Sequence, residues 1–312
     1  MDLHTKRCLS VIVPMKNEAQ NVLALYTQLN QTISSIENCD MELICIDDGS
    51  HDDTLVELLK LKQQDSRLKI IELSRCFGKE AALSAGLDFV SGDAALPFDA
   101  DLQDPVAVIP EMVEKWRAGS QIVLAKRINR QAESFIKRTT ALLYYKLHNK
   151  LSKNKIEENV GDFRLLDKTV ADQLKKMKEK NRFMKGIFSW VGYPSDCVFY
   201  VRDKRHAGNS HFNFFKLLDL AVEGLTGFSS IPLKVWTVVG FFISLVSFFY
   251  GVYVVFLTLF KGVVVPGYAS LFVGLCFFSG IQLISLGIIG EYVARIYIET
   301  KQRPIYLIKD IY

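Results

Sequence analysis

The sequence contains one long stretch that is almost devoid of charge. Between Val235 and Gly290 lie 56 residues, and Lys261 is the only charged residue among them. Elsewhere charge is plentiful, because Asp, Glu, Lys and Arg still make up 23% of the 312 residues. This contrast excludes a wholly soluble protein and indicates a soluble part joined to a membrane part. Since about 20 apolar residues span a bilayer, only about two spans fit, which excludes a many-span transporter.

Other absences exclude further classes of protein. The six cysteines form no C-x-x-C pair and no histidine lies at zinc-ligand spacing, so we expect reduced thiols in a cytosolic setting. No long apolar run follows the N-terminal residues, so no signal peptide is expected. A net charge of +4 does not suggest a nucleic-acid partner. Without a G-x-G-x-x-G motif or a P-loop, a nicotinamide dehydrogenase and a P-loop ATPase are unsupported.

The first 130 residues alternate between short β-type runs and helical stretches. Helices are expected at Ala19–Ile36 and Thr54–Gln64, for example, and strands at 9–13, 43–46, 68–73, 94–98 and 121–125. This alternation predicts an α/β domain with a mostly parallel sheet covered on both faces. Such sheets bind ligands at the carboxyl ends of their strands. The acidic clusters Asp47-Asp48 and Asp99–Asp104 lie at two such ends.

Asp99, Asp101 and Gln103 place oxygen ligands at alternate positions after the fourth predicted strand. Such ligands can converge on one hard cation, Mg²⁺ or Mn²⁺. Their spacing is equally compatible with a solvated acidic turn, or with helix caps for the run that starts at Pro105. Asp48, at the end of the second strand, could hold a ribose hydroxyl or a base N–H. The alternative is an N-cap cluster for the helix from about Asp53.

Two amphipathic stretches and the uncharged C-terminal region predict membrane association. Residues 135–155 and 213–230 are basic or apolar amphipathic stretches that fit either surface helices or helices at an anionic membrane surface. Spans are expected at 235–260 and 268–290, joined by a linker with the turn signal Pro266-Gly267. Lysine and arginine flank the outer ends of this hairpin, which predicts that both termini are cytoplasmic. The expected organisation is a catalytic domain (1–212), an interfacial segment (213–234), a hairpin (235–290) and a cytoplasmic tail (291–312).

Several motifs resemble family-2 glycosyltransferases of the GT-A fold. They are LSVIVPMKNEAQNV at 9–22, the run at 47–50, LSRCFGKEAALSAGLDFVSG at 73–92 and PFDADLQDP at 97–105. Later motifs are similar to those of polyprenyl-phosphate glycosyltransferases, above all the bactoprenol glucosyltransferases of O-antigen modification and, more distantly, dolichol-phosphate mannose synthases. These later motifs are LAKR at 124–127, EENVGDFRLL at 157–166, RFMKGIFSWVG at 182–192 and GEYVARIYIETKQRPIY at 290–306.

The resemblance implies roles for individual residues. It implies a metal and diphosphate site at Asp99, Asp101 and Gln103, and a nucleotide-sugar pocket at Pro14, Asn17, Glu18, Asp48 and Asp99. It implies catalytic roles for Asp101, Arg127 and Asp162. Basic and polar residues for the acceptor phosphate are expected at Arg138, Arg164, Arg202, Arg205 and Ser210. His211 stands where such enzymes usually carry lysine, which puts a phosphate contact there in doubt.

The implied reaction transfers a sugar, foremost glucose from UDP-glucose, to undecaprenyl phosphate with inversion at C1 and with Mg²⁺ or Mn²⁺. A phosphate acceptor is largely a dianion at neutral pH, so Asp162 is expected to orient groups more than to remove a proton. Other donors, such as GDP-mannose or a UDP-amino sugar, stay open, as does a non-catalytic nucleotide-sugar binder. The resemblance further implies a homotetramer in the bacterial inner membrane. A separate flippase and a downstream glycosyltransferase are expected as partners.

Overall fold

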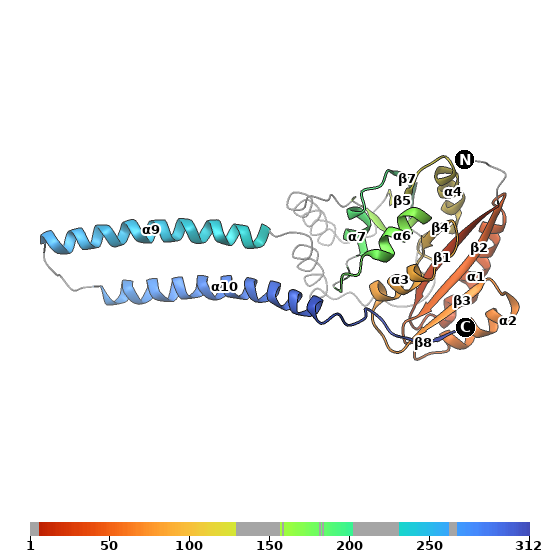
Figure 1. Ribbon diagram of the computed structural model, residues 1–312, viewed down its shortest axis with the longest axis horizontal. Coiled ribbons are helices and arrows are strands. Elements are labelled where there is room, and N and C mark those ends of the chain that lie inside the picture. Colours follow the sequence, from red (N-terminus) through yellow and green to blue (C-terminus); the bar gives the residue numbers. More distant parts are fainter. Residues whose placement is uncertain are drawn as a thin grey trace. The chain divides into compact units, whose positions relative to one another are not determined.

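The computed structural model describes residues 6–128, 157, 159–180, 182, 184–201, 231–261 and 267–312. The described chain forms two compact units (Figure 1). The first contains the N-terminal part of the chain together with Arg303–Tyr312, and the second contains two long C-terminal helices.

The first unit is built on a mixed sheet of eight strands in the order β7-β5-β6-β4-β1-β2-β3-β8. Four of its seven pairings are parallel, namely β1 with β2, β1 with β4, β2 with β3, and β5 with β7. The predicted α/β class is thereby confirmed, whereas the sheet is more mixed than expected, because three of its pairings are antiparallel. The strands are β1 (Arg7–Met15), β2 (Cys39–Asp47), β3 (Leu68–Leu73), β4 (Ala94–Pro97), β5 (Ile122–Arg127), β6 (Val160–Asp167), β7 (Ser195–Tyr200) and β8 (Ile308–Ile311).

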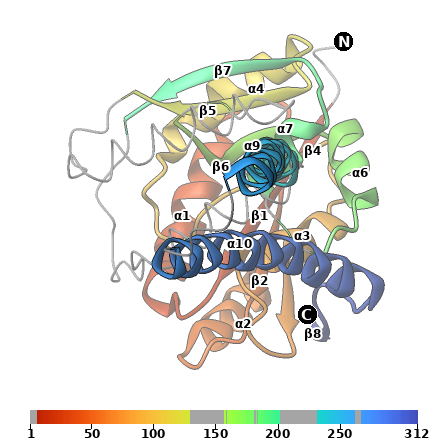
Figure 2. The ribbon, with the colours of Figure 1, turned by 90° about the vertical axis from the view of Figure 1, so that its left-hand side faces the viewer.

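Helices cover both faces of this sheet (Figure 2). On one face α1 packs on β2, α2 on β3 and α4 on β5, while on the other face α3 packs on β1 and β2, and α6 and α7 pack on β6. The bounds are α1 (Ala19–Ser34), α2 (Thr54–Gln64), α3 (Lys79–Asp88), η1 (Val106–Val108), α4 (Ile109–Arg117), α6 (Lys168–Lys176) and α7 (Met184–Trp190).

The order of the strands explains where a ligand site can form. The chain moves outward from β1 through β2 to β3, and then returns to place β4 on the other side of β1. Right-handed crossovers on such a path put α1 and α3 on opposite faces of the sheet. The strand order therefore reverses between β1 and β4, and open α/β sheets bind ligands outside the carboxyl ends of the strands at such a point.

Aromatic packing joins β4, β6 and β7, which lie on the same side of β1 in the sheet. Phe98, directly after β4, meets Phe163 of β6 edge to face, with ring centroids 5.2 Å apart. Phe163 in turn meets Tyr200 of β7 at 6.0 Å. All three side chains are buried. Rigid aromatic contacts therefore set the relative positions of the acidic loop after β4 and the start of β6.

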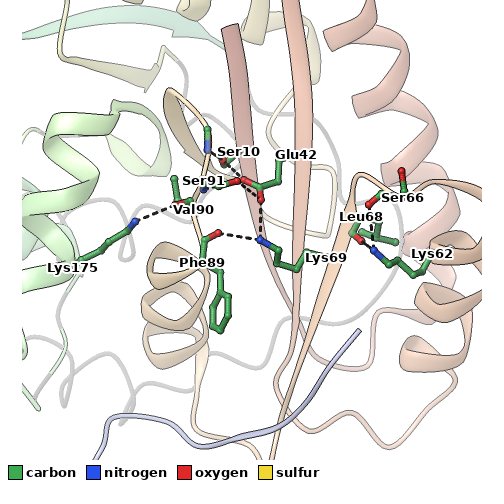
Figure 3. A network of polar contacts seen from close by, with 11 residues as sticks. Ser10, Glu42, Lys62, Ser66, Leu68, Lys69, Phe89, Val90, Ser91 and Lys175 are labelled. Carbon is green, nitrogen blue, oxygen red and sulfur yellow. Dashed lines mark hydrogen bonds and ion pairs between the residues drawn. The ribbon is translucent and has the colours of Figure 1, made fainter.

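A polar network joins the strands nearer their amino-terminal ends (Figure 3). The carboxylate of Glu42 accepts hydrogen bonds from Ser10 Oγ at 2.5 Å and Ser91 Oγ at 2.7 Å, and it pairs with Lys69 Nζ at 3.0 Å. Ser10 Oγ also accepts a hydrogen bond from the backbone N–H of Gly92. The network links β1, β2, β3 and the turn before β4, so its role is structural.

The chain returns to the first unit after the second long helix and ends as β8. This strand pairs antiparallel with the outer edge of β3. Lys309 Nζ lies 2.6 Å from Glu72 Oε1, and the Tyr312 hydroxyl donates to the same carboxylate at 3.0 Å. The Tyr306 hydroxyl donates to Asp88 at 2.6 Å. The C-terminal segment, expected only as a tail, is thus part of the sheet.

The second unit consists of α9 (Ile231–Lys261) and α10 (Tyr268–Thr300). At 1.5 Å per residue both are longer than the roughly 30 Å of a bilayer core. Within the described helices, the segment Phe277–Thr300 is long and apolar enough to cross a membrane, and Val238–Tyr253 is apolar but shorter. The helix α10 also continues past the expected end of the second span at Gly290. The two-span hairpin therefore stays a prediction.

Candidate functional site

The loops after β1 and β2 are bound to each other at the carboxyl end of the sheet. Asn17 has a positive φ of 57°, and its backbone N–H donates to Ser50 Oγ at 3.0 Å. Its side-chain oxygen accepts a hydrogen bond from the backbone N–H of His51 at 2.8 Å. The Glu18 N–H donates to Thr54 Oγ1 at 2.8 Å. Asn17 and Glu18, two of the residues predicted for the nucleotide pocket, thus join the loop after β1 to the loop after β2. Pro14, also predicted for that pocket, lies in β1.

Asp48 holds the next loop, the one between β3 and α3. Its carboxylate accepts hydrogen bonds from the backbone N–H groups of Phe77 at 2.6 Å and Gly78 at 2.9 Å. The neighbouring Gly49 has a φ of +66°, and a Cβ there would lie 2.7 Å from the Cys76 nitrogen. A close backbone approach therefore requires glycine. In this arrangement Asp48 shapes the loop that precedes α3.

That loop places Lys79, the first residue of α3, between two carboxylates. Its Nζ lies 2.7 Å from Asp99 Oδ1 and 2.7 Å from Asp162 Oδ2. Asp99 follows β4, whereas Asp162 lies in β6, so three separate elements meet at one ammonium group. The structure therefore brings together the predicted donor-side Asp99 and acceptor-side Asp162. Their common partner, Lys79, had no predicted role.

Charges around Asp162 keep it ionised. Burial by itself would raise the pKa of Asp162, but the positive charges of Lys79 and Lys185 outweigh burial and lower it to about 2. Glu80, next to Lys79, shows the opposite behaviour, because burial and the negative charge of Asp162 raise its pKa to about 7. A carboxylate with such a low pKa is a poor base at neutral pH, which favours an orienting role for Asp162.

Arg164 lies beneath Asp162 and is 5% exposed. Its guanidinium stacks on the Phe188 ring, with Cζ 4.1 Å from the centroid, and Nη2 donates to the Gly161 carbonyl at 2.5 Å. Burial lowers its pKa to about 10, so it stays cationic. Arg164 Nε and Asp162 Oδ1 are buried polar atoms without a hydrogen-bond partner. Arg164 and Lys185 also line a cavity of about 160 Å³ beside α7, together with Leu124, Val160, Phe188 and Tyr193.

Asp101 and Gln103 form a tight turn after β4. The Gln103 N–H donates to Asp101 Oδ1 at 3.2 Å, and Leu102 between them has a φ of 54°. Within the described residues, no three His, Cys, Asp or Glu side chains form a group that could hold a metal by themselves. Mg²⁺ is commonly bound by one or two carboxylates that leave further positions for water and substrate phosphates. Asp99 and Asp101 fit that open kind of site rather than an all-protein cage.

Arg127 ends β5 on the other side of this turn. Its Nε donates to the Tyr200 hydroxyl at 2.9 Å, and its Nη2 lies 3.5 Å from Asp104 Oδ1. Tyr200 donates in turn to Asp104 at 2.6 Å. The guanidinium also approaches Gly161, where an added Cβ would lie 3.1 Å from Nη2. Arg127 is thus oriented by Asp104 and Tyr200, and it borders the backbone just before Asp162.

Four predicted acceptor-phosphate residues lie outside the described residues. They are Arg138, Arg202, Arg205 and Ser210. Sequence reasoning assigned no role to Lys79, Glu80, Lys185 or Tyr200. A signal for Lys79 was available, since it directly follows a glycine in the loop after the third predicted strand, and such loops commonly bind ligands. Tyr200 carried no such signal, because its partners are remote in sequence.

The family model described as Glycosyl transferase family 2 matches residues 10–175, and that described as GtrB C-terminal hairpin matches residues 231–296. The chain is 48% identical to the bactoprenol glucosyl transferase of Shigella phage SfV, over 97% of this chain and 98% of the relative. It is 47% identical to the prophage bactoprenol glucosyl transferase homolog of Escherichia coli (strain K12), over 97% and 99%. It is 41% identical to the uncharacterized glycosyltransferase YkcC of Bacillus subtilis (strain 168), over 97% and 94%.

Proposed function

We propose, from the premise that this chain belongs to glycosyl transferase family 2, that it transfers a sugar from a nucleotide-diphosphate sugar to a polyprenyl phosphate. Glucose from UDP-glucose is the proposed sugar, and undecaprenyl phosphate is the proposed acceptor. The observation that carries this proposal is full-length similarity to bactoprenol glucosyl transferases, which extends from the α/β unit through both C-terminal helices. The product would be a lipid-linked sugar donor for modification of O-antigen or another cell-envelope glycan.

On the donor side, Asp99, Asp101 and Gln103 would hold Mg²⁺ or Mn²⁺ together with the donor diphosphate. A divalent cation supplies Lewis-acid neutralisation of the charge that develops on a departing diphosphate. The pocket for the nucleoside would be bordered by Pro14, Asn17 and Glu18, with Asp48 fixing the loop before α3. The hydrogen bonds of Asn17 and Glu18 support this assignment, because they join two loops at the carboxyl ends of β1 and β2, where such sheets bind ligands.

On the acceptor side, a phosphate oxygen would attack the sugar C1 and invert that centre. The acceptor is already largely a dianion at neutral pH, so the protein has to attract and orient it rather than deprotonate it. The cations Arg127, Arg164 and Lys185 would draw the phosphate toward Asp162. The low pKa of Asp162 supports this division of roles, because an ionised carboxylate can orient neighbouring cations but is a weak base.

The second unit would hold the site at the depth of a lipid phosphate. We propose that α9 and α10 form a two-span hairpin in the inner membrane, with the α/β unit and both termini in the cytoplasm. The pairing of β8 with β3 supports this arrangement, because the chain leaves and re-enters one globular unit. An even number of membrane crossings is then required. A homotetramer, a separate flippase and a downstream transferase remain proposals by resemblance.

Incubation of the full-length protein with radiolabelled donors tests the function. Membranes containing the chain would receive undecaprenyl phosphate and UDP-glucose, GDP-mannose or a UDP-amino sugar, each with and without EDTA. We expect label in the lipid fraction with UDP-glucose, and loss of the label with EDTA. Asp101→Asn is expected to be inactive, whereas the exposed Asp53→Asn serves as a charge-matched control. Absence of transfer from every donor would contradict the proposed enzyme function and favour a non-catalytic nucleotide-sugar binder.

A further inference from the structure

Lys79 is the one described residue that contacts both Asp99 and Asp162. Each contact is 2.7 Å long, and the two carboxylates come from β6 and from the loop after β4. The Lys79 side chain is 43% exposed, and its ammonium group lies between the two acids. The Asp48–Gly78 hydrogen bond fixes the residue that precedes it. The loop between β3 and α3, which Asp48 binds through the backbone of Phe77 and Gly78, therefore positions Lys79.

We propose that Lys79 is a positioning residue that serves as the counter-ion of the donor-side acid until a divalent cation binds. It offsets part of the negative charge of Asp99 and Asp162 and keeps both carboxylates within reach of one ammonium group. This inference rests on the proposed metal at Asp99 and Asp101. A cation at Asp99 competes with the Lys79 ammonium for the same carboxylate, and Lys79 then remains on Asp162. The lysine thus couples occupation of the donor site to the placement of the acceptor-side carboxylate.

The charge of Lys79 should affect metal binding and sugar transfer in opposite directions. A positive charge in contact with Asp99 repels an arriving divalent cation and occupies one of its ligand oxygens. Removal of that charge should therefore strengthen metal binding. The same change leaves Asp162 without a closely bound cation on Oδ2, so its orientation is lost and sugar transfer becomes slower. A residue that only stabilised the fold would not improve metal affinity when it is replaced.

The test compares Lys79→Met with the wild type in the full chain, in detergent and without donor. Titration with Mn²⁺, followed by the electron paramagnetic resonance signal of the free ion, gives the affinity. We expect Lys79→Met to bind Mn²⁺ about tenfold more tightly, and to transfer sugar to undecaprenyl phosphate at least about tenfold more slowly. Lys79→Arg, which keeps the charge, should bind Mn²⁺ as the wild type does. Lys60→Met removes an exposed charge on α2 and should change neither quantity.

Unchanged or weaker Mn²⁺ binding by Lys79→Met, with a wild type that binds the ion, overturns the inference and leaves the proposed function intact. A wild type that binds no Mn²⁺ and transfers sugar in EDTA overturns both the inference and the metal site, but not sugar transfer itself. If Lys79→Met does not fold, judged by its melting curve, Lys79→Gln replaces it. That variant keeps a hydrogen-bond donor without the charge. Its Mn²⁺ affinity and its rate of sugar transfer are then compared with those of the wild type in the same way.

Discussion

At the residue scale, the site is governed by pairing of charges across elements. Asp162, Lys79 and Asp99 form a chain in which each carboxylate shares the same ammonium group. Arg127, Tyr200 and Asp104 form a second chain beside it. In both chains a basic side chain is oriented by an acid from another strand or loop. Small displacements of one member therefore alter the position of the others.

Asp162→Asn separates an orienting role from a base role. Because the pKa of Asp162 is lowered to about 2, the carboxylate is ionised throughout the working range and cannot impose a pH dependence there. We expect the variant to transfer sugar about 100-fold more slowly, by the same factor at every pH between 6 and 9. The measurement is kcat against pH for both proteins with saturating donor. A loss confined to low pH, where the acceptor phosphate is protonated, would restore Asp162 as the base.

At the element scale, the sheet is held at its two ends by different means. Backbone contacts and charged loops hold the carboxyl ends, whereas the Glu42 network joins β1, β2 and β3 nearer their amino-terminal ends (Figure 3). Burial tends to raise the pKa of Glu42, but hydrogen bonds from Ser10, Ser91 and Lys69 outweigh it and lower the pKa. A carboxyl group whose pKa is lower in the folded state stabilises the fold when it is ionised.

Glu42→Gln should therefore destabilise the protein in a pH-dependent way. The stabilisation by Glu42 is fully present above its ordinary pKa of 4.5, and it is lost as the pH falls through the lower folded-state pKa. At pH 7 we expect a loss of about 1–3 kcal/mol, because buried hydrogen bonds to a charged group are broken. Melting curves of both proteins at pH 7 and at pH 4 measure it. Glu57→Gln, on the surface of α2, is the control, and an equal deficit at both pH values would refute the prediction.

The strand β8 is the second element with a testable role. Deletion of residues 308–312 uncovers the edge of β3 and removes Lys309 and Tyr312 from Glu72, which is 7% exposed. We expect a clear fall in melting temperature and more aggregation, since an unpaired edge strand with a buried carboxylate is left. Tyr312→Phe removes one exposed hydroxyl and should lower the melting temperature only slightly. A deletion variant as stable as Tyr312→Phe would show that β8 adds nothing beyond that contact.

At the scale of the whole molecule, the two units differ in whether their apolar side chains are buried or exposed. The α/β unit buries its apolar side chains in a core, whereas many large apolar side chains of α9 and α10 are exposed, as Phe241, Phe256 and Leu275 are. Exposed aromatic and aliphatic surface of this extent requires a lipid or protein partner. The proposed hairpin meets this requirement.

The sequence by itself determined the class of the fold, the five strands of the first 130 residues, the family and the acidic residues at the strand ends. These depend on local periodicity and on motifs whose members lie close together along the chain. Only the tertiary structure decided that Lys79 lies between Asp99 and Asp162, that Tyr200 orients Arg127, and that the last residues form β8. Apart from the contact between Lys79 and Asp99, these contacts join residues 73 to 237 positions apart, and no local pattern encodes them. Long-range charge pairing arises only when the sheet order brings the elements to one edge.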